Sequence, residues 1–306
     1  MTVSWPDEVD RVLAGDMTAA LAYLTPARGA VVTGVAPVGM RDREHGTVTF
    51  TTSLGLGKKL ERIRRDPRVA LAYHARDHGF ATGDLYVLVQ GRCRPVPQAD
   101  PAWNREVLGP ASERFMGPPR RGPFWDRWLR EYYADRVPVT VEVDRVVVWP
   151  GLDCAGDPDV HGSPRPAAPP DPQDPPKKGV SPRVDTAKAA AQLRRLPHVL
   201  ASWREADGFP TVVSAQVALA AAGGIRLSSG HPLPPGGRRA GMLGHDYRAQ
   251  LVGLVSRQYT GWLEDGVYAP HTSGGFRAPG NKTLVLLANG LMAKRGLRKA
   301  RGRRAP

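Results

Sequence analysis

Residues 49–71 read TFTTSLGLGKKLERIRRDPRVAL, and this stretch decides the fold. It opens within a strand, because residues 47–53 are β-branched, aromatic and alternating. Leu56, Leu60 and Ile63 then recur at helical spacing, which predicts a helix with one apolar and one basic face. Asp66 and Pro67 end that helix, since a residue before proline disfavours the helical conformation. The following RVALAYH, residues 68–74, predicts another strand.

The segments on either side extend this pattern into a mainly β chain. We expect a helix within residues 5–22, strands at 22–25, 30–38, 85–96 and 137–149, and a helical stretch at 101–134 that breaks near residue 117. Strand and helix do not alternate as they do in a doubly wound sheet. The order therefore predicts an α+β fold of two antiparallel, Greek-key-like split β-barrel halves with peripheral helices.

A second half is expected because the same layout recurs after a proline-rich segment. Residues 198–217 resemble residues 20–38, residues 224–229 resemble 46–53, residues 239–245 resemble 68–74, and residues 251–264 resemble the strand around Gly91. The second copy has GHPLPPGGR at residues 230–238 where the first has its basic helix, and this composition excludes a helix. We expect a barrel at 1–153, a linker at 154–187, a degenerate repeat at 188–292 and a basic tail at 293–306.

The deciding stretch also carries the groups that a phosphate needs. Thr51, Thr52 and Ser53 supply hydroxyls at the end of a strand, and glycines after them let a ligand approach the backbone. Lys58 and Lys59 open a helix, whose free N–H groups and positive potential attract anions. The alternative is a solvated basic surface. GLGKKL has neither the third glycine of a dinucleotide fingerprint nor the pattern of a P-loop.

This stretch resembles the FMN-phosphate segment of the pyridoxamine 5'-phosphate oxidase-like split barrels. The shared features are a strand ending in Thr or Ser, a short loop, a lysine, two apolar helix positions and Asp-Pro-Arg-Val. The resemblance implies FMN or a deazaflavin coenzyme, with haem a less favoured alternative. It places Lys59 as the phosphate-binding lysine. It also implies a cofactor-binding set in which three residues lie near the ring and a fourth bonds or shapes the flavin: Ala36, Pro37, Val38 and Gln90.

The resemblance further implies an oxidoreductase acting on a small molecule, with a flavin site built between two barrels. One chain with two copies would form this site as a pseudo-dimer, and a homodimer is the alternative. The substrate-phosphate arginines of the true pyridoxamine oxidases have no counterpart here, so that reaction is not expected and no catalytic residue is assigned. Flavin chemistry needs no such side chain, because the cofactor itself carries the electrons. A non-catalytic flavin- or haem-binding protein remains the second hypothesis.

Charge and composition restrict the remaining classes. The formal net charge is +14, and seven basic residues lie within 294–304. This end is expected as a solvated tail, with polyanion contact as the alternative, and without a recognition signature nucleic-acid binding is not favoured. Two cysteines and no apolar run of membrane-spanning length indicate a cytoplasmic protein. The histidines lack metal-site spacing, and His74 and His245 are expected as ordinary residues at equivalent strand ends.

Overall fold

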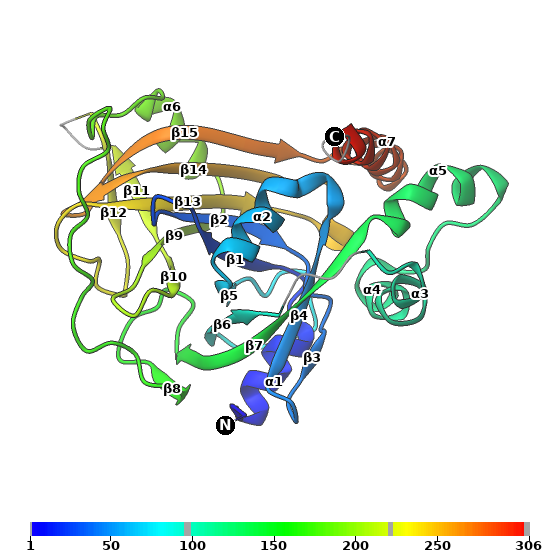
Figure 1. Ribbon diagram of the computed structural model, residues 1–306, viewed down its shortest axis with the longest axis horizontal. Coiled ribbons are helices and arrows are strands. Elements are labelled where there is room, and N and C mark those ends of the chain that lie inside the picture. Colours follow the sequence, from blue (N-terminus) through cyan, green and yellow to red (C-terminus); the bar gives the residue numbers. More distant parts are fainter. Residues whose placement is uncertain (1, 95–98, 220–222, 303–306) are drawn as a thin grey trace.

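The first half is built around an eight-stranded antiparallel sheet (Figure 1). The computed structural model describes residues 2–94, 99–219 and 223–302. In the sheet the strands lie in the order β2-β1-β5-β6-β7-β4-β3, with β8 paired to β7. Their bounds are β1 (Ala19–Leu24), β2 (Ala30–Val35), β3 (Arg41–Asp42), β4 (Thr47–Ser53), β5 (Arg68–Tyr73), β6 (Tyr86–Cys93), β7 (Arg136–Trp149) and β8 (Asp159–Gly162).

The second half is built around a seven-stranded sheet with the order β10-β9-β13-β14-β15-β12-β11, which is the first order shifted by eight strand numbers. The strand bounds are β9 (His198–Arg204), β10 (Pro210–Ser214), β11 (Gln216–Leu219), β12 (Ile225–Ser228), β13 (Arg238–Asp246), β14 (Val255–Glu264) and β15 (Val267–Arg277). The predicted class, a mainly β fold of antiparallel split-barrel halves with peripheral helices, is confirmed.

Helices lie around the sheets rather than between parallel strands (Figure 1). Residues 229–237, between β12 and β13, form no helix, as predicted from their prolines and glycines. The helices are α1 (Asp7–Gly15), η1 (Leu54–Leu56), α2 (Gly57–Arg65), α3 (Pro101–Trp103), η2 (Asn104–Leu108), α4 (Gly109–Met116), α5 (Pro123–Ala134), α6 (Thr186–Leu193), η3 (Ala249–Leu251) and α7 (Lys282–Gly302).

Three expected segments differ in the structure. The first helix ends at Gly15, and β1 starts at Ala19, because every residue of β1 is buried and an apolar run of this kind has no period that separates strand from helix. The expected linker contributes β8, whose backbone pairs with the edge of β7 and needs no apolar side chains to do so. The basic end continues a helix that starts at Lys282. Residues 303–306 of the expected tail lie outside the described residues, and so do residues 95–96 of the strand expected at 85–96.

The two halves pack through opposite faces of the same strands. In β1, Leu21 and Tyr23 belong to the core of the first half, whereas Ala20 and Ala22 belong to a core shared with the second half. This alternation follows from the two-residue period of a strand. The small side chains on the outward face let the sheets approach closely.

The contact between the halves is reciprocal. Strand β2 packs against β9, β13 and β14, and its counterpart β10 packs against β1, β5 and β6. A surface that meets its own equivalent in this way is what a two-fold interface requires. The two halves are therefore arranged like the subunits of a symmetric dimer.

Gly241 on β13 marks a close approach of two backbones at this seam, and its replacement should destabilise the fold. A Cβ at this position would lie 2.8 Å from the carbonyl oxygen of Ala30 on β2. Because the obstacle is backbone, we expect Gly241→Val to cost about 1–3 kcal/mol of unfolding free energy in urea titrations. Gly34→Val on β2 is the matched control, since a Cβ there has no neighbour within 4 Å. Equal midpoints for the two variants would contradict the close approach.

Candidate functional site

Lys59 is the predicted phosphate ligand, and it lies in the first turn of α2 with only 9% of its surface exposed. Its neighbour Lys58 is exposed. Burial, together with the nearby guanidinium group of Arg136, lowers the pKa of the Lys59 ammonium group to about 8. Among the described residues the ammonium group forms no hydrogen bond or ion pair. A buried cation beside another cation, with no carboxylate of its own, is stabilised by a bound anion.

The three hydroxyls predicted to meet the phosphate do not share a face. Thr52 points to the inner side of the sheet with Val48 and Phe50, whereas Thr51 and Ser53 point to the other side because side chains alternate along a strand. The Thr52 hydroxyl is buried and has no partner among the described residues. The three hydroxyls therefore do not line one face of the sheet together, and their contact with a phosphate or ribityl chain stays a prediction.

Ser53 already has two hydrogen bonds. Its hydroxyl donates to Asp135 Oδ2 at 2.5 Å and accepts from the backbone N–H of Gly55 at 3.1 Å. Burial raises the pKa of Asp135, although the bond from Ser53 opposes that shift. Ser53 thus caps η1 and holds the start of β7, which is a structural role.

Helix α7 covers the glycine loop that precedes α2. The Cα atoms of Gly55 and Gly296 approach so closely that a Cβ on Gly55 would lie 2.9 Å from Gly296 Cα. The same helix packs along α5, where Lys294 Nζ lies 4.0 Å from the ring centre of Trp128 (Figure 1). Glycine spacing in residues 282–296 was the available signal for this contact, but nothing in the sequence connects it to the loop at residue 55.

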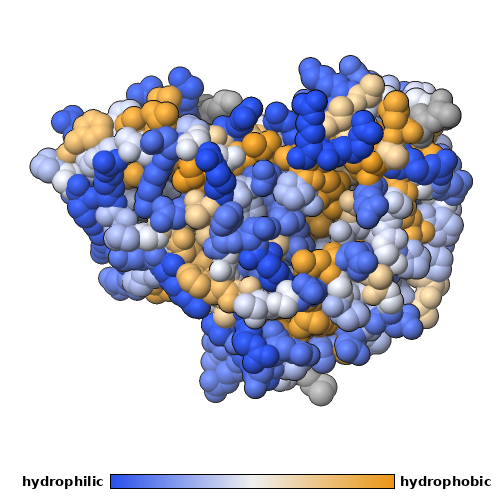
Figure 2. Space-filling view, turned by 180° about the vertical axis from the view of Figure 1, so that it is seen from behind, coloured by the Kyte–Doolittle hydropathy of each residue, from blue (hydrophilic) through white to orange (hydrophobic). Residues whose placement is uncertain are grey.

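Apolar side chains remain at the surface over α5 and α7. Phe124, Leu284, Leu291 and Met292 are exposed by 58%, 52%, 42% and 43%, and Figure 2 shows apolar residues on that part of the molecule. In the part of the chain that the structure describes, no helix combines the length and apolar character needed to cross a membrane.

The predicted ring-binding turn is packed rather than open. Val38 adopts a left-handed conformation with φ of 46°, which is rare for a β-branched residue. It lies in a small cluster with Leu108 and Phe115 from the helical stretch and Tyr247 from the second half. Pro37 is also buried, and Ala36 packs at the edge of the cluster. A ring placed against Ala36–Val38 would have to displace part of this cluster.

Gln90 was predicted to bond or shape the flavin, and the structure instead places it in a buried network at the seam. Its amide donates to the Pro210 carbonyl at 2.7 Å and accepts from Arg145 Nε at 2.5 Å. Arg145 Nη2 lies 2.6 Å from Asp207 Oδ2. Both hydrogen-bonding ends of Gln90 are therefore engaged, one across the seam to Pro210 and one to Arg145 of the same half. Its role at a flavin stays a prediction.

His74 and His245 were expected to be ordinary residues, and the structure brings them into contact between the halves. Their Nε2 atoms are 2.6 Å apart, and the rings are nearly perpendicular. The register of the two sheets makes these residues equivalent. Ala72, two residues before His74, pairs with Ala20 on β1, and Leu243, two residues before His245, pairs with Leu200 on β9. The pair therefore lies on the axis that relates the halves.

The tautomers of this pair follow from its partners. His74 Nδ1 lies 2.9 Å from the Ala72 carbonyl oxygen, so it carries a proton, and Nε2 of the neutral ring accepts one from His245. Burial lowers the pKa of His74 to about 3 and lowers that of His245 well below its usual value. Next to them, His198 Nε2 lies 2.7 Å from Asp77 Oδ2. Over the described ranges, no cluster of three or more acidic, histidine or cysteine residues is suited to a metal ion.

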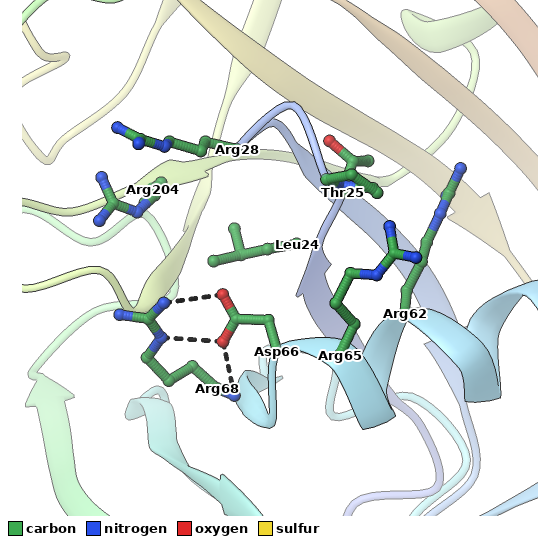
Figure 3. Close-up of a pocket in the computed structure, with 9 residues that line it drawn as sticks. Leu24, Thr25, Arg28, Arg62, Arg65, Asp66, Arg68 and Arg204 are labelled. Carbon is green, nitrogen blue, oxygen red and sulfur yellow. Dashed lines mark hydrogen bonds and ion pairs between the residues drawn. The ribbon is translucent and has the colours of Figure 1, made fainter.

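Two of the cavities on the described surface contain no predicted site residue in their lining. One of about 470 Å³ lies beside α6 and β14–β15. The other, of about 200 Å³, lies at the C-terminal end of α2 (Figure 3). Its lining is basic and comes from both halves, and no spacing in the sequence indicates it because its arginines are far apart in the chain.

Known proteins resemble this chain only in part. No family model matches the chain, and no curated protein matches it. Similar solved structures include a conserved hypothetical protein of Mycobacterium tuberculosis, with 20% identity over 48% of this chain and 86% of that one at a TM-score of 0.36. A protein called F420 reductase has 21% identity over 46% and 98% at 0.33.

A third similar structure is a pyridoxamine 5'-phosphate oxidase-related, FMN-binding protein of Nostoc punctiforme. It shares 11% identity over 43% of this chain and 73% of that one, with a TM-score of 0.30. Because these TM-scores lie below 0.5, we base no functional conclusion on the matches.

Proposed function

We propose that this protein is an oxidoreductase that binds FMN or a deazaflavin through the coenzyme phosphate at the first turn of α2. One observation carries the proposal: the ammonium group of Lys59 is buried, lies near Arg136 and has no described anionic partner. The unpartnered hydroxyl of Thr52 fits the same ligand, because phosphate oxygens accept hydrogen bonds. When bound, the flavin ring would supply the hydride chemistry.

The chain's own residues would then bind and orient the coenzyme. Lys59 would provide the charge, and a phosphate dianion beside it would raise the pKa of the ammonium group back towards its usual value. The N–H groups at the start of α2 would add their dipoles. Helix α7 would exclude water from the loop at Gly55 through its contact with Gly296.

The common strand order and the reciprocal contacts support a further part of the proposal. The two halves act as a pseudo-dimer within one chain, the second being a degenerate copy of the first. In the described residues a helix, α2, follows β4 of the first half, whereas no helix separates β12 from β13 in the second half. Only the first half therefore offers a phosphate cradle. A cytoplasmic location and a small-molecule substrate belong to the same proposal.

Replacing Lys59 by methionine should weaken coenzyme binding by tenfold or more, because a charge-assisted hydrogen bond to phosphate contributes about 1.5–3 kcal/mol. The measurement is a fluorescence titration of the full chain with FMN and with a deazaflavin coenzyme. Lys58→Met is the control, since Lys58 is adjacent in sequence but exposed. Equal affinity in the two variants, or no binding of either coenzyme by the unaltered protein, would remove the proposal.

A second candidate function is a non-catalytic flavin- or haem-binding protein. The packed cluster around Val38 favours it, because side chains from both halves leave little room for a substrate beside the expected ring position. Absorption spectra of the purified protein separate the two functions. A bound flavin that a nicotinamide hydride donor reduces supports the oxidoreductase, whereas a bound chromophore that stays oxidised supports the second candidate.

A further inference from the structure

The cavity at the C-terminal end of α2 is lined by five arginines and one aspartate: Arg28, Arg62, Arg65, Arg68, Arg204 and Asp66. Figure 3 shows Leu24 between Arg28 and Arg204 on one side and Arg62 and Arg65 on the other. The cavity measures about 200 Å³, several times the roughly 30 Å³ that one water occupies in the liquid. The lining therefore carries a large excess of positive charge around a cavity that can hold more than one water molecule.

The single carboxylate of the lining is already used. Asp66 accepts two hydrogen bonds from the Arg68 side chain, both at 2.8 Å, and a third from the Arg68 backbone N–H. Arg65 has only Glu61, at 3.9 Å and exposed, so that contact is weak. Four guanidinium groups are thus left without a strong counter-ion from within the cavity.

These like charges are held together across the seam between the halves. Arg28 lies in the β1–β2 turn of the first half, and Arg204 ends β9 of the second half. Arg68 Nη1 and Arg204 Nη2 both reach Gly208, where an added Cβ would lie 2.1 Å and 3.1 Å from them. Burial lowers the pKa of Arg204, and repulsion from Arg68 and Arg28 lowers it further.

We propose that this cavity is a binding site for the phosphate or diphosphate group of a small molecule. Arginine forks match phosphate oxygens in pairs, and several of them converging on one space suit a multiply charged anion. The site is distinct from the one at Lys59, which opens α2, whereas Arg62 and Arg65 belong to its last turn. It does not depend on flavin binding, and an anion held there would neutralise charges from both halves.

Isothermal titration of the full chain with inorganic pyrophosphate, at constant ionic strength, tests the site. We expect Arg65→Gln and Arg204→Gln each to weaken binding by about tenfold or more. Arg64→Gln is the matched control, because Arg64 is the preceding residue of α2, is exposed and does not line the cavity. The affinity of the Arg64→Gln variant for pyrophosphate should stay within about twofold of that of the unaltered protein, because removing a distant surface charge has only a small screened effect.

Other outcomes would overturn this assignment. Equal weakening by Arg64→Gln and Arg65→Gln would show that a basic surface binds any polyanion, nucleic acid included. Weakening by Lys59→Met alone would place pyrophosphate at the start of α2, which would remove this site and leave the proposed function standing. Failure of Lys59→Met to weaken coenzyme binding, with the arginine variants behaving as expected, would remove the proposed function and leave this site.

Discussion

Lowering the pH from 7.5 to 5 should cost this protein at least about 2 kcal/mol more unfolding free energy than it costs a double variant, His74→Gln with His245→Gln. Burial holds the folded pKa of His74 near 3 and that of His245 well below its usual value, whereas both groups titrate near 6.5 when unfolded. Below pH 6.5 the unfolded chain therefore binds more protons than the folded chain, and the free energy of unfolding decreases as the pH is lowered. At pH 5 this amounts to about 2 kcal/mol for His74, and His245 adds to it in the same direction.

The comparison with the double variant is necessary because another buried group acts in the opposite direction. Burial raises the pKa of the Asp16 carboxyl group to about 7, despite its ion pair with Arg76. Protonation of Asp16 in the folded state therefore stabilises the protein as the pH falls from 7. That contribution is common to both proteins and cancels in the difference. Urea titrations at several pH values give the two curves, and parallel curves would show that the histidines are not held neutral.

Burial keeps this pair neutral, and its position between the halves favours the same state. A residue on the axis of a two-fold arrangement meets its own equivalent, so a charge on one is a like charge against the other. A neutral pair avoids this repulsion, because one imidazole donates to the other. We infer that the contact joins the two halves at neutral pH and weakens their association in acid.

The sequence predicted much of the fold because strand alternation and the proline-rich break are local signals. The strand at residues 47–53, the helix after it and the missing helix before β13 follow from the order and type of neighbouring residues. It did not predict β8 or the extent of α7. Pairing at the β7 edge and the contact of α7 with the loop at Gly55 depend on residues distant in the chain.

The candidate site could be predicted only in its local part. The sequence indicated Lys59 correctly as a helix-opening lysine, but it could not show that Lys59 is buried and Lys58 exposed. Gln90 was placed near the flavin by the family resemblance, whereas its amide group bonds Pro210 of the second half and Arg145 of its own half. The arginine cavity draws Arg28 and Arg204 from different halves, so no spacing along the chain could indicate it.

The second large effect is expected from Asp207→Ala, which should lower the unfolding free energy by about 3–5 kcal/mol. Arg145 is only 2% exposed, and its guanidinium group faces Asp207 across the seam at 2.6 Å. The N–H direction is not aligned for a hydrogen bond, so charge holds this pair. Without the aspartate, Arg145 keeps its bonds to Gln90 and Pro164 but loses the carboxylate that offsets its desolvation.

Asp144→Ala is the control, because Asp144 pairs with Arg92, whose side chain is 52% exposed, and such a surface pair contributes at most about 1 kcal/mol. A further variant, Arg145→Met with Asp207→Ala, should recover part of the loss, since it removes the isolated charge together with its partner. Urea midpoints of the three variants measure these differences. If Asp207→Ala costs no more than Asp144→Ala, the seam is solvated at Arg145, and this ion pair does not help to hold the two halves together.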